Sequence, residues 1–389
     1  MEAATFGQPP LYFLTTMKIM IGFWAIPWML LMGCGDDNSQ TPDTPPANVI
    51  EVSPVDLQFD AAGEEKTIIV KSNTEWALTT DGQTWYSLSA KSGFTGETAV
   101  KIIALKNNLD KERSAVLSFT EGADSPKEYR FKQGKGIVEN YVPEGYSLVW
   151  KDEFEDVRLS GGKPALPNKT EWWYETAGPG WVNNELQRYI ADGFLGTDTC
   201  SMITDGTLKI IAKKKGNEVL SARINTSKSW TYGYFEARLK LPKGKGTWPA
   251  FWMMPKNYTA WPDDGEIDIM EEVGYRPNYV SSSIHCKAYY HSIGTQKTGE
   301  QLVPTAESDF HIYALEWTEE YIKGFVDGKC HFTFNNDNTG NKNTWPFNAP
   351  FYLKLNLAWG GSWGGAEGVD ESALPVTYEI DYVRVYQKK

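Results

Sequence analysis

The sequence predicts an all-β protein built from two successive β-sandwiches, a small one and then a larger jelly roll. Short segments that alternate apolar and polar residues, separated by turn residues, recur from residue 49 onward. No stretch of useful length carries apolar residues at helical spacing. Glycine and proline residues concentrate between positions 134 and 145. We therefore expect a linker over residues 135–145, between a sandwich at 49–134 and a jelly roll at 146–389.

Composition limits the class of protein. The chain has 389 residues, enough for two domains, and its 41% hydrophobic and 23% charged residues are typical of soluble globular proteins. The net charge of −12 and the lack of a basic stripe argue against a nucleic-acid partner. Aromatic residues reach 14%, which fits either sugar-stacking surfaces or tryptophan-rich β cores.

The first 34 residues are expected to be an export signal. Met17-Lys18 precedes an apolar run that ends at Met32. This run has a positive start and is short for a membrane span, so a signal peptide is favoured over an anchor. Translation could start at Met17 instead of Met1. The segment Leu-Met-Gly-Cys at 31–34 resembles a bacterial lipobox, which would make Cys34 the lipidated first residue of the mature chain. A plain secretory signal with an accidental cysteine is the alternative.

Residues 35–48 are polar and proline-rich, and we expect a tether between lipid and first sandwich. The acidic segment GDDN at 35–38 resembles the surface-export signal of Bacteroidetes lipoproteins. That resemblance implies an outer-membrane lipoprotein at the cell surface, held to the membrane through its lipid anchor.

The small sandwich at 49–134 resembles the BACON family. The matching features, in chain order, are SNTEW (72–76), Trp85, SG (92–93), the segment from Asn107 to Arg113, and FKQ (131–133). The resemblance implies an immunoglobulin-like β-sandwich that acts as a spacer or as a glycan-binding accessory. We expect Trp76 and Trp85 in its core; a sugar-binding platform is the alternative.

An acidic strand in the second sandwich is the main candidate for chemistry. Alternation in EIDIMEE places Glu266 and Asp268 on one face. Glu271 would point to the opposite face unless a β-bulge at Ile269-Met270 adds one residue. With that bulge the three acids form one row. Glycoside hydrolysis with retention needs two carboxyl groups about 5–5.5 Å apart. A solvated acidic strand beside a turn is the alternative.

Residues 146–389 resemble glycoside hydrolase family 16 over nearly their whole length. The matching segments are VWKDEF (149–154), NNELQ (183–187), YGYFEAR (232–238), WPAFWM (248–253), EIDIME (266–271), WGGSWGG (359–365) and EIDYVRVY (379–386). The resemblance implies a concanavalin-like jelly roll and a retaining endo-hydrolase. It assigns Glu266 as nucleophile, Glu271 as acid/base and Asp268 as the residue that positions the nucleophile, with no cofactor for catalysis.

The branch of the family that this chain resembles indicates the substrate. The bulged six-residue motif and the loops around His285 and His291 resemble the laminarinase-like branch. The implied activity is that of an endo-1,3(4)-β-glucanase on β-1,3-glucan or mixed-linkage β-1,3/1,4-glucan, and we expect a monomer. The alternative is a non-catalytic, surface glycan-binding lipoprotein of the same fold. Retention of all three acids favours the enzyme.

Seven further residues are candidate substrate contacts, each with a structural alternative. The tryptophans either stack on glucose rings or fill the core. Two loop residues either bind sugar hydroxyls or cap a turn, and a histidine either reaches the acid/base residue or a sugar hydroxyl, or is simply buried and hydrogen-bonded. The candidates are Trp252, Trp248, Trp359, Trp363, Asn184, Glu185 and His285.

The family resemblance also implies a structural calcium ion. Glu153, near the start of the second sandwich, and Asp381, near its end, supply the hard oxygen ligands that calcium prefers. Two side chains do not complete such a site, so backbone carbonyls and water would have to supply the remaining ligands.

Overall fold

The computed structural model describes residues 49–121, 125–155, 164–191 and 198–389. The expected signal peptide, Cys34 and the whole of the expected tether at 35–48 lie outside these residues. None of the helices in the described ranges is both long and apolar enough to cross a membrane. The prediction of an all-β protein is confirmed: apart from many strands, the described residues form one α-helix, α1 (Gly361–Gly364), and the 3-10 turns His291–Ile293 and Glu371–Ala373.

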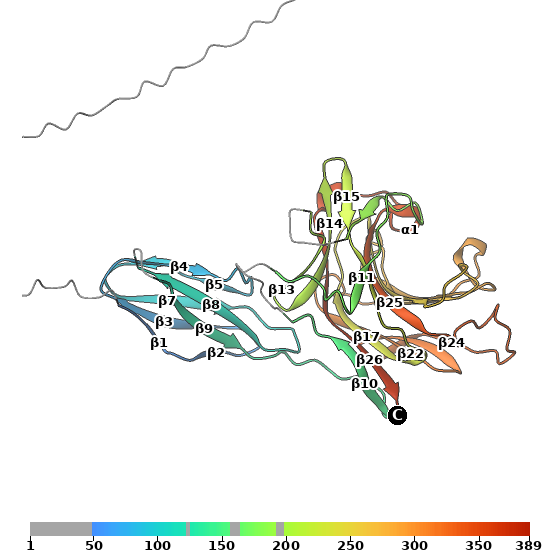
Figure 1. Ribbon diagram of the computed structural model, residues 1–389, viewed down its shortest axis with the longest axis horizontal. Helices are drawn as coiled ribbons and strands as arrows, with labels where there is room; N and C mark the ends of the chain where they lie inside the picture. Colours follow the sequence, from blue (N-terminus) through green and yellow to red (C-terminus); the bar gives the residue numbers. More distant parts are fainter. Residues whose placement is uncertain (1–48, 122–124, 156–163, 192–197) are drawn as a thin grey trace, which may run out of the picture. The chain divides into compact units, whose positions relative to one another are not determined.

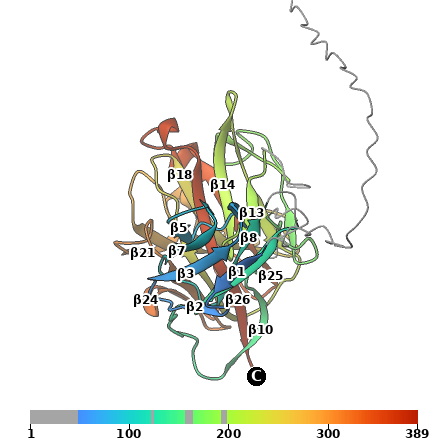
Figure 2. The ribbon, with the colours of Figure 1, turned by 90° about the vertical axis from the view of Figure 1, so that its left-hand side faces the viewer.

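The first sandwich consists of two sheets that enclose their own hydrophobic core. One sheet contains, in spatial order, β1 (Ile50–Ser53), β3 (Glu64–Ser72), β7 (Gly96–Ala104) and β5 (Tyr86–Leu88). The other contains β2 (Leu57–Phe59), β9 (Lys127–Gln133), β8 (Arg113–Thr120), β4 (Trp76–Thr80) and β6 (Ser92–Gly93). Figure 2 shows β1, β3 and β7 side by side.

Alternation along the strands builds this first core. In β8, Ala115, Leu117 and Phe119 are buried while the residues between them are partly exposed. The same period-2 pattern directs every second side chain to one face of a sheet. Trp76 and Trp85 are each 3% exposed and belong to the core. The prediction that they are core residues is confirmed, so neither serves as an exposed sugar platform.

The second sandwich has a large sheet on one side, antiparallel except where β12 pairs with β15. Its strands, in spatial order, are β12 (Gln187–Tyr189), β15 (Glu218–Ser221), β14 (Thr207–Lys215), β26 (Val376–Lys388), β17 (Gly233–Lys240), β22 (His311–Trp317), β23 (Tyr321–Val326) and β24 (Lys329–Asn335). Two further strands join this sheet, β10 (Tyr146–Asp152) beside β26 and β13 (Ser201–Thr204) beside β14. Figure 1 shows β17, β22 and β26 within it.

The opposing sheet carries the acidic strand. Its order is β11 (Trp172–Tyr174), β16 (Arg223–Thr226), β25 (Phe351–Trp359), β18 (Thr247–Pro255), β19 (Glu266–Glu271), β20 (Tyr279–His285) and β21 (Lys297–Leu302). Apolar residues from both sheets, including Phe251, Ile267, Leu355 and Val385, form one continuous core. This two-sheet arrangement confirms the predicted jelly-roll sandwich.

The predicted bulge lies in β19. Phe251 of β18 pairs with Met270, but its neighbour Trp252 pairs with Asp268, so Ile269 has no partner of its own on β18. The register also shifts against β20 between Asp268 and Glu271. Ile269 and Met270 are both buried. The bulge therefore directs two successive apolar residues into the core and returns Glu271 to the face of the other two acids.

A side chain of the neighbouring strand stabilises this bulge. Ser282 of β20 donates a hydrogen bond from its hydroxyl to the carbonyl oxygen of Ile269, at 2.7 Å. That carbonyl is buried and outside the regular ladder, where a missing partner would cost about 1–3 kcal/mol. Gly324 leaves room for the serine, because a Cβ there would lie 2.4 Å from the Ser282 hydroxyl oxygen.

Candidate active site

Two tryptophans orient the outer carboxyl groups of the acidic row, which we define as Glu266, Asp268 and Glu271. The indole N–H of Trp261 donates to Glu266 Oε2 at 3.2 Å. The indole N–H of Trp248 donates to Glu271 Oε1 at 2.9 Å. Both glutamates remain partly exposed, whereas Asp268 between them is 3% exposed. The outer acids can thus meet a substrate, whereas the middle one is removed from solvent.

His285 lies beside the first two acids of the row. It is the direct cross-strand partner of Glu266, on β20. Its Nε2 atom is 3.3 Å from Asp268 Oδ2 and 3.9 Å from Glu266 Oε1. Trp261 and His291 pack against its ring. The histidine therefore acts on Glu266 and Asp268 most directly. It is itself 7% exposed, which fits a buried histidine, and its Nδ1 has no hydrogen-bond partner among the described residues.

Burial changes the acidity of all three acids. It raises the pKa of Glu266, Asp268 and Glu271 to about 8 in each case. For the two glutamates the negative charge of Asp268 raises the pKa further. Desolvation disfavours the charged form, and like charges close together cannot all ionise cheaply. At neutral pH the acidic row therefore retains protons, which supplies both an acid and a base from one strand.

The surroundings of the two glutamates differ in charge. After burial and Asp268, the largest influence on Glu266 is His285, which lowers its pKa. The Trp248 hydrogen bond and then His285 lower the pKa of Glu271, and Glu185 is an additional negative neighbour that raises it. The two glutamates thus differ in the groups around them but share a pKa raised to about 8.

Three of the predicted aromatic contacts line the row. Trp252 is partly exposed and pairs with Asp268 across β18 and β19. Its indole N–H donates to Asn356 Oδ1 at 2.7 Å, which fixes the ring. Trp248 and Trp363 are partly exposed and meet edge to face, with ring centroids 5.3 Å apart. These rings offer fixed apolar faces beside the carboxyl groups.

The prediction that Trp359 contacts ligand is wrong. The residue is the last of β25, is 0% exposed and belongs to the hydrophobic core. The glycine-rich loop begins only after it, at Gly360, where φ is +69°. Of the two tryptophans in the motif, the strand residue points inward and Trp363, in α1, is the accessible one.

Asn184 and Glu185 have different surroundings. Asn184 is exposed, has a φ of +53°, and donates from Nδ2 to Ser362 Oγ at 2.9 Å. Glu185 is 4% exposed and accepts hydrogen bonds from Gln187 Nε2 at 2.7 Å and the Tyr189 hydroxyl at 2.9 Å. Asn184 is thus a turn residue free to meet a sugar, while Glu185 stabilises the loop from within.

Two buried cations lie under the Trp252 ring, and the sequence analysis did not predict them as site residues. The Lys354 ammonium lies 4.8 Å from the Trp252 ring centroid, and the Arg223 guanidinium carbon lies 5.5 Å from it. Both contact Glu175, at 2.7 Å for Lys354 and 3.8 Å for Arg223. Burial lowers the pKa of Lys354 to about 8. The sequence did contain an indication of both cations, because each is the single charged residue within an otherwise apolar or neutral strand segment.

The acidic row also has the geometry of a metal site. Glu266, Asp268 and His285 offer donor atoms within 4.8 Å of one another, the one such group among the described residues. Indole N–H groups hydrogen-bond the outer carboxyl groups of the row, and Glu271 extends it beyond this group.

Comparison with known proteins identifies both parts of the chain. Residues 192–384 match the model of glycosyl hydrolases family 16, and residues 74–127 match BACON, described as a putative binding domain. A β-glucanase of Rhodothermus marinus is 46% identical over 255 residues, which span 62% of this chain and 85% of the relative.

Solved structures agree. A non-specific endo-β-1,3(4)-glucanase of family GH16 is 43% identical, with a TM-score of 0.58, over 64% of this chain and 93% of that one. A laminarinase from Rhodothermus marinus is 44% identical, with a TM-score of 0.57, over 62% of this chain and 97% of that one. Together with the fold and the acidic row, these matches show that the chain belongs to glycosyl hydrolases family 16 and carries a BACON domain before its catalytic sandwich.

Proposed function

We propose that the chain is a retaining endo-β-glucanase that cleaves β-1,3-glucan or mixed-linkage β-1,3/1,4-glucan by double displacement. The observation that carries the proposal is the bulged acidic row: two glutamates on one face, each held by an indole N–H, with a buried aspartate between them. The similar glucanases and laminarinases support the substrate class.

The first step forms a covalent intermediate. The Glu266 carboxylate attacks the anomeric carbon while Glu271 donates its proton to the departing glycosidic oxygen. The bond to the leaving sugar breaks, and an ester to Glu266 replaces it. In the second step Glu271, now ionised, takes a proton from water, whose oxygen displaces Glu266. The product retains its β configuration, Glu266 is again a carboxylate, and Glu271 is again protonated.

Asp268 and His285 position the nucleophile. Asp268 is the buried member of the row, and His285 Nε2 lies within 4 Å of both Asp268 and Glu266. The histidine can hydrogen-bond either carboxyl group and so limit the rotation of Glu266. The reaction needs only the two glutamates and a water molecule, and family 16 glucanases need no cofactor for catalysis.

The substrate is a glucan whose sugar rings stack on the tryptophans beside the row. Trp252, Trp248 and Trp363 offer partly exposed rings there, and Asn184 offers an amide to a sugar hydroxyl. Product profiles on laminarin, lichenan and curdlan would rank the linkages, because each polymer presents a different sequence of β-1,3 and β-1,4 bonds.

Replacement of the nucleophile tests the proposal. Glu266→Gln keeps the shape and the Trp261 hydrogen bond but cannot attack carbon. We expect a folded protein whose release of reducing ends from laminarin and barley glucan is lost. Wild-type release by this variant would refute the assignment. Absence of release by the wild-type protein, with retained binding to the same polymers, would instead favour a non-catalytic glycan-binding protein.

We also propose that the mature chain is a monomeric lipoprotein, anchored through Cys34 at the outer surface of the outer membrane. The support is the apolar run before the lipobox-like segment at 31–34. Cys34→Ser should abolish lipid labelling and move the protein from the membrane fraction to the soluble fraction. Unchanged fractionation would contradict anchoring, and light scattering would check the monomer.

A further inference from the structure

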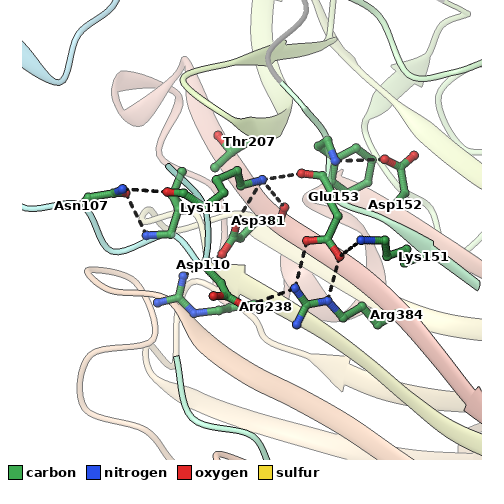
Figure 3. A network of polar contacts seen from close by, with 12 residues as sticks. Asn107, Asp110, Lys111, Lys151, Asp152, Glu153, Thr207, Arg238, Asp381 and Arg384 are labelled. Atoms are coloured by element: carbon green, nitrogen blue, oxygen red, sulfur yellow. Dashed lines mark hydrogen bonds and ion pairs between the residues drawn. The ribbon is translucent and has the colours of Figure 1, made fainter. Parts of the chain in front are cut away.

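The two carboxylates expected to hold calcium already face cations of the protein (Figure 3). Both side-chain oxygens of Glu153 accept hydrogen bonds from Arg384, at 2.9 Å each, and Lys151 lies 3.5 Å away. Asp381 is 0% exposed, and its Oδ2 accepts from Arg238 Nη1 at 2.9 Å. Both side-chain oxygens of Glu153 and one of Asp381 are therefore already engaged by cations of the protein.

An ammonium group fills the remaining oxygen positions. Lys111 Nζ donates to the carbonyl oxygen of Glu153 and to that of Asp381, the latter at 3.2 Å. The same nitrogen lies 3.2 Å from Asp381 Oδ1. An ammonium group has three donors and no acceptor, so three oxygens satisfy it. With Lys111 in place these residues do not fit the calcium ion expected from the sequence, because the ammonium group occupies the oxygens that the ion would need.

The lysine belongs to the BACON sandwich, not to the catalytic one. It lies between β7 and β8, and its side chain is only 11% exposed. The oxygens that it meets belong to residues that follow β10 and lie within β26 of the catalytic sandwich. A charge of one sandwich is thus buried in the other.

The loop that carries Lys111 is held in shape by Asn107, which is 1% exposed. The Asn107 amide donates to the carbonyl oxygens of Lys111 and Gly134, at 2.8 Å each, and its Oδ1 accepts from the Leu109 N–H at 3.1 Å. Gly136 closes over the same loop, since a Cβ there would lie 2.5 Å from the Asn107 carbonyl. The lysine therefore enters the contact from a pre-organised loop, which lowers the entropy lost in burying it.

Neighbouring contacts join the same two sandwiches. Asp110 Oδ2 lies 3.4 Å from Arg384 Nη2, so Arg384 pairs with Asp110 of the first sandwich as well as with Glu153 of the second. The Thr84 N–H and hydroxyl donate to Asp205, at 3.1 and 3.2 Å. Gly206 has a φ of +75°, and a Cβ there would meet Leu109 at 3.2 Å.

We propose that Lys111 is a built-in cation of the catalytic sandwich: the BACON domain supplies an ammonium group to the oxygen cradle of Glu153 and Asp381, where a free divalent cation would otherwise bind. The BACON domain thereby couples its own folding to that of the enzyme. The catalytic sandwich becomes independent of calcium, and the two sandwiches unfold together.

The experiment measures how calcium affects the stability of proteins with and without the Lys111 ammonium group. Lys111→Met keeps most of the aliphatic stem and removes the charge. Lys101→Met is the matched control, because Lys101 is an exposed lysine of the same sandwich whose ion pair with Glu65 stays within that sandwich. Full-length proteins are treated with EDTA and dialysed, and unfolding is followed by calorimetry with and without calcium at roughly 10 mM, above the 10⁻⁴–10⁻³ M range of weak extracellular sites.

The proposal predicts opposite responses. Calcium should leave the unfolding midpoint of the wild type and of Lys101→Met unchanged. Lys111→Met should unfold at a lower midpoint without calcium and regain about 2–4 °C with it, because the cradle then binds the ion. Magnesium, which prefers a smaller and fully regular site, should restore less.

Two results would overturn the proposal. One is stabilisation of EDTA-treated wild type by calcium, which would mean that the cradle binds metal with Lys111 present; this measurement needs no variant. The other is a Lys111→Met protein with the midpoint of the control and no response to calcium. Unchanged laminarin hydrolysis in Lys111→Met would verify that the variant is folded, since Lys111 does not belong to the acidic row.

Discussion

The acidic row of β19 and the Glu153–Asp381 cluster both remove carboxylates from water, but they differ in the cations that face them. In the row, His285 is the one ion-pair partner among the described residues. In the cluster, Glu153 faces Arg384 and Lys151, and Asp381 faces Arg238 and Lys111.

The balance of charge separates a reactive group from a structural one. Burial raises the pKa of Glu266 and Glu271 to about 8, because too few positive charges offset it. Burial also opposes ionisation of Glu153, but the hydrogen bonds and charge of Arg384 outweigh it and hold its pKa below the ordinary value. Of these two groups of carboxylates, the one that can exchange a proton near neutral pH is the one with fewer cations facing it.

The largest expected effect is a loss of activity that separates two adjacent glutamates at the end of β19. Glu271→Gln should lower kcat/KM on laminarin by roughly 10²–10⁴-fold, because it removes the proton donor. Glu272→Gln is the matched control: burial also raises the pKa of Glu272 to about 8, but its carboxyl group accepts from the Asn278 N–H instead of facing the row. Equal losses in the two variants would mean that position in the row does not matter.

Breaking the structural cluster should affect stability, not catalysis. Arg384→Met leaves Glu153 without its main partner and should lower the free energy of unfolding by about 2–3 kcal/mol at pH 7, less than for a fully buried pair because both side chains retain some exposure. Since the folded-state pKa of Glu153 is lowered, this loss is present above its unfolded pKa and should shrink as pH falls below about 4.3.

Urea unfolding at pH 7 and pH 4 measures the Arg384 effect. Lys132→Met serves as control, because its ion pair with Glu112 is exposed on both sides. A pH-independent loss in Arg384→Met would indicate lost packing of the side chain over the Tyr382 ring instead of a lost charge interaction.

Replacing an acid of the row by a neutral residue should raise the free energy of unfolding at high pH instead of lowering it. The pKa of Glu271 is raised, so its contribution to stability is complete below the unfolded pKa near 4.3 and is lost as pH rises through about 8. Glu271→Gln should therefore be more stable than wild type by roughly 1–2 kcal/mol at pH 8.5 and equal to it at pH 4. Glu300→Gln, at an exposed ion pair of β21, should show no such trend. Destabilisation of Glu271→Gln at pH 8.5 would contradict the raised pKa.

The smallest expected effect concerns the one cation near the row. His285 lowers the pKa of Glu266, which burial raises. His285→Gln should therefore move the acid limb of the kcat/KM–pH profile upward by roughly half to one unit. His311→Gln, whose imidazole pairs with Asp327, is the control. A profile of unchanged shape would limit His285 to a packing role.

The sequence was sufficient to predict the structure of the site where the prediction depended on neighbouring residues of one strand. The step from Asp268 to Glu271 required a bulge for the acids to share a face, and the pairing of Ile269 and Met270 bears this out. It failed at Trp359, because a strand residue and a loop residue of the same motif, Trp363, look alike until the strand end is known.

Long-range charge pairing could not be predicted. Lys111 and Asp381 are separated by most of the chain, and a lysine in a turn between strands reads as an ordinary solvated residue. Lys354 and Arg223 are similar: each was visible as a cation within a strand, but only the fold shows that both lie beneath Trp252.

The most direct test of the account is to trap the covalent intermediate. A 2-fluoro-substituted β-glucosyl donor with a good leaving group should label the protein once, and mass spectrometry should place the sugar on Glu266, because this carboxylate is the proposed nucleophile. Glu266→Gln should take no label. A label on Glu271 or Glu272, or products released with inverted configuration, would contradict the assignment of the row.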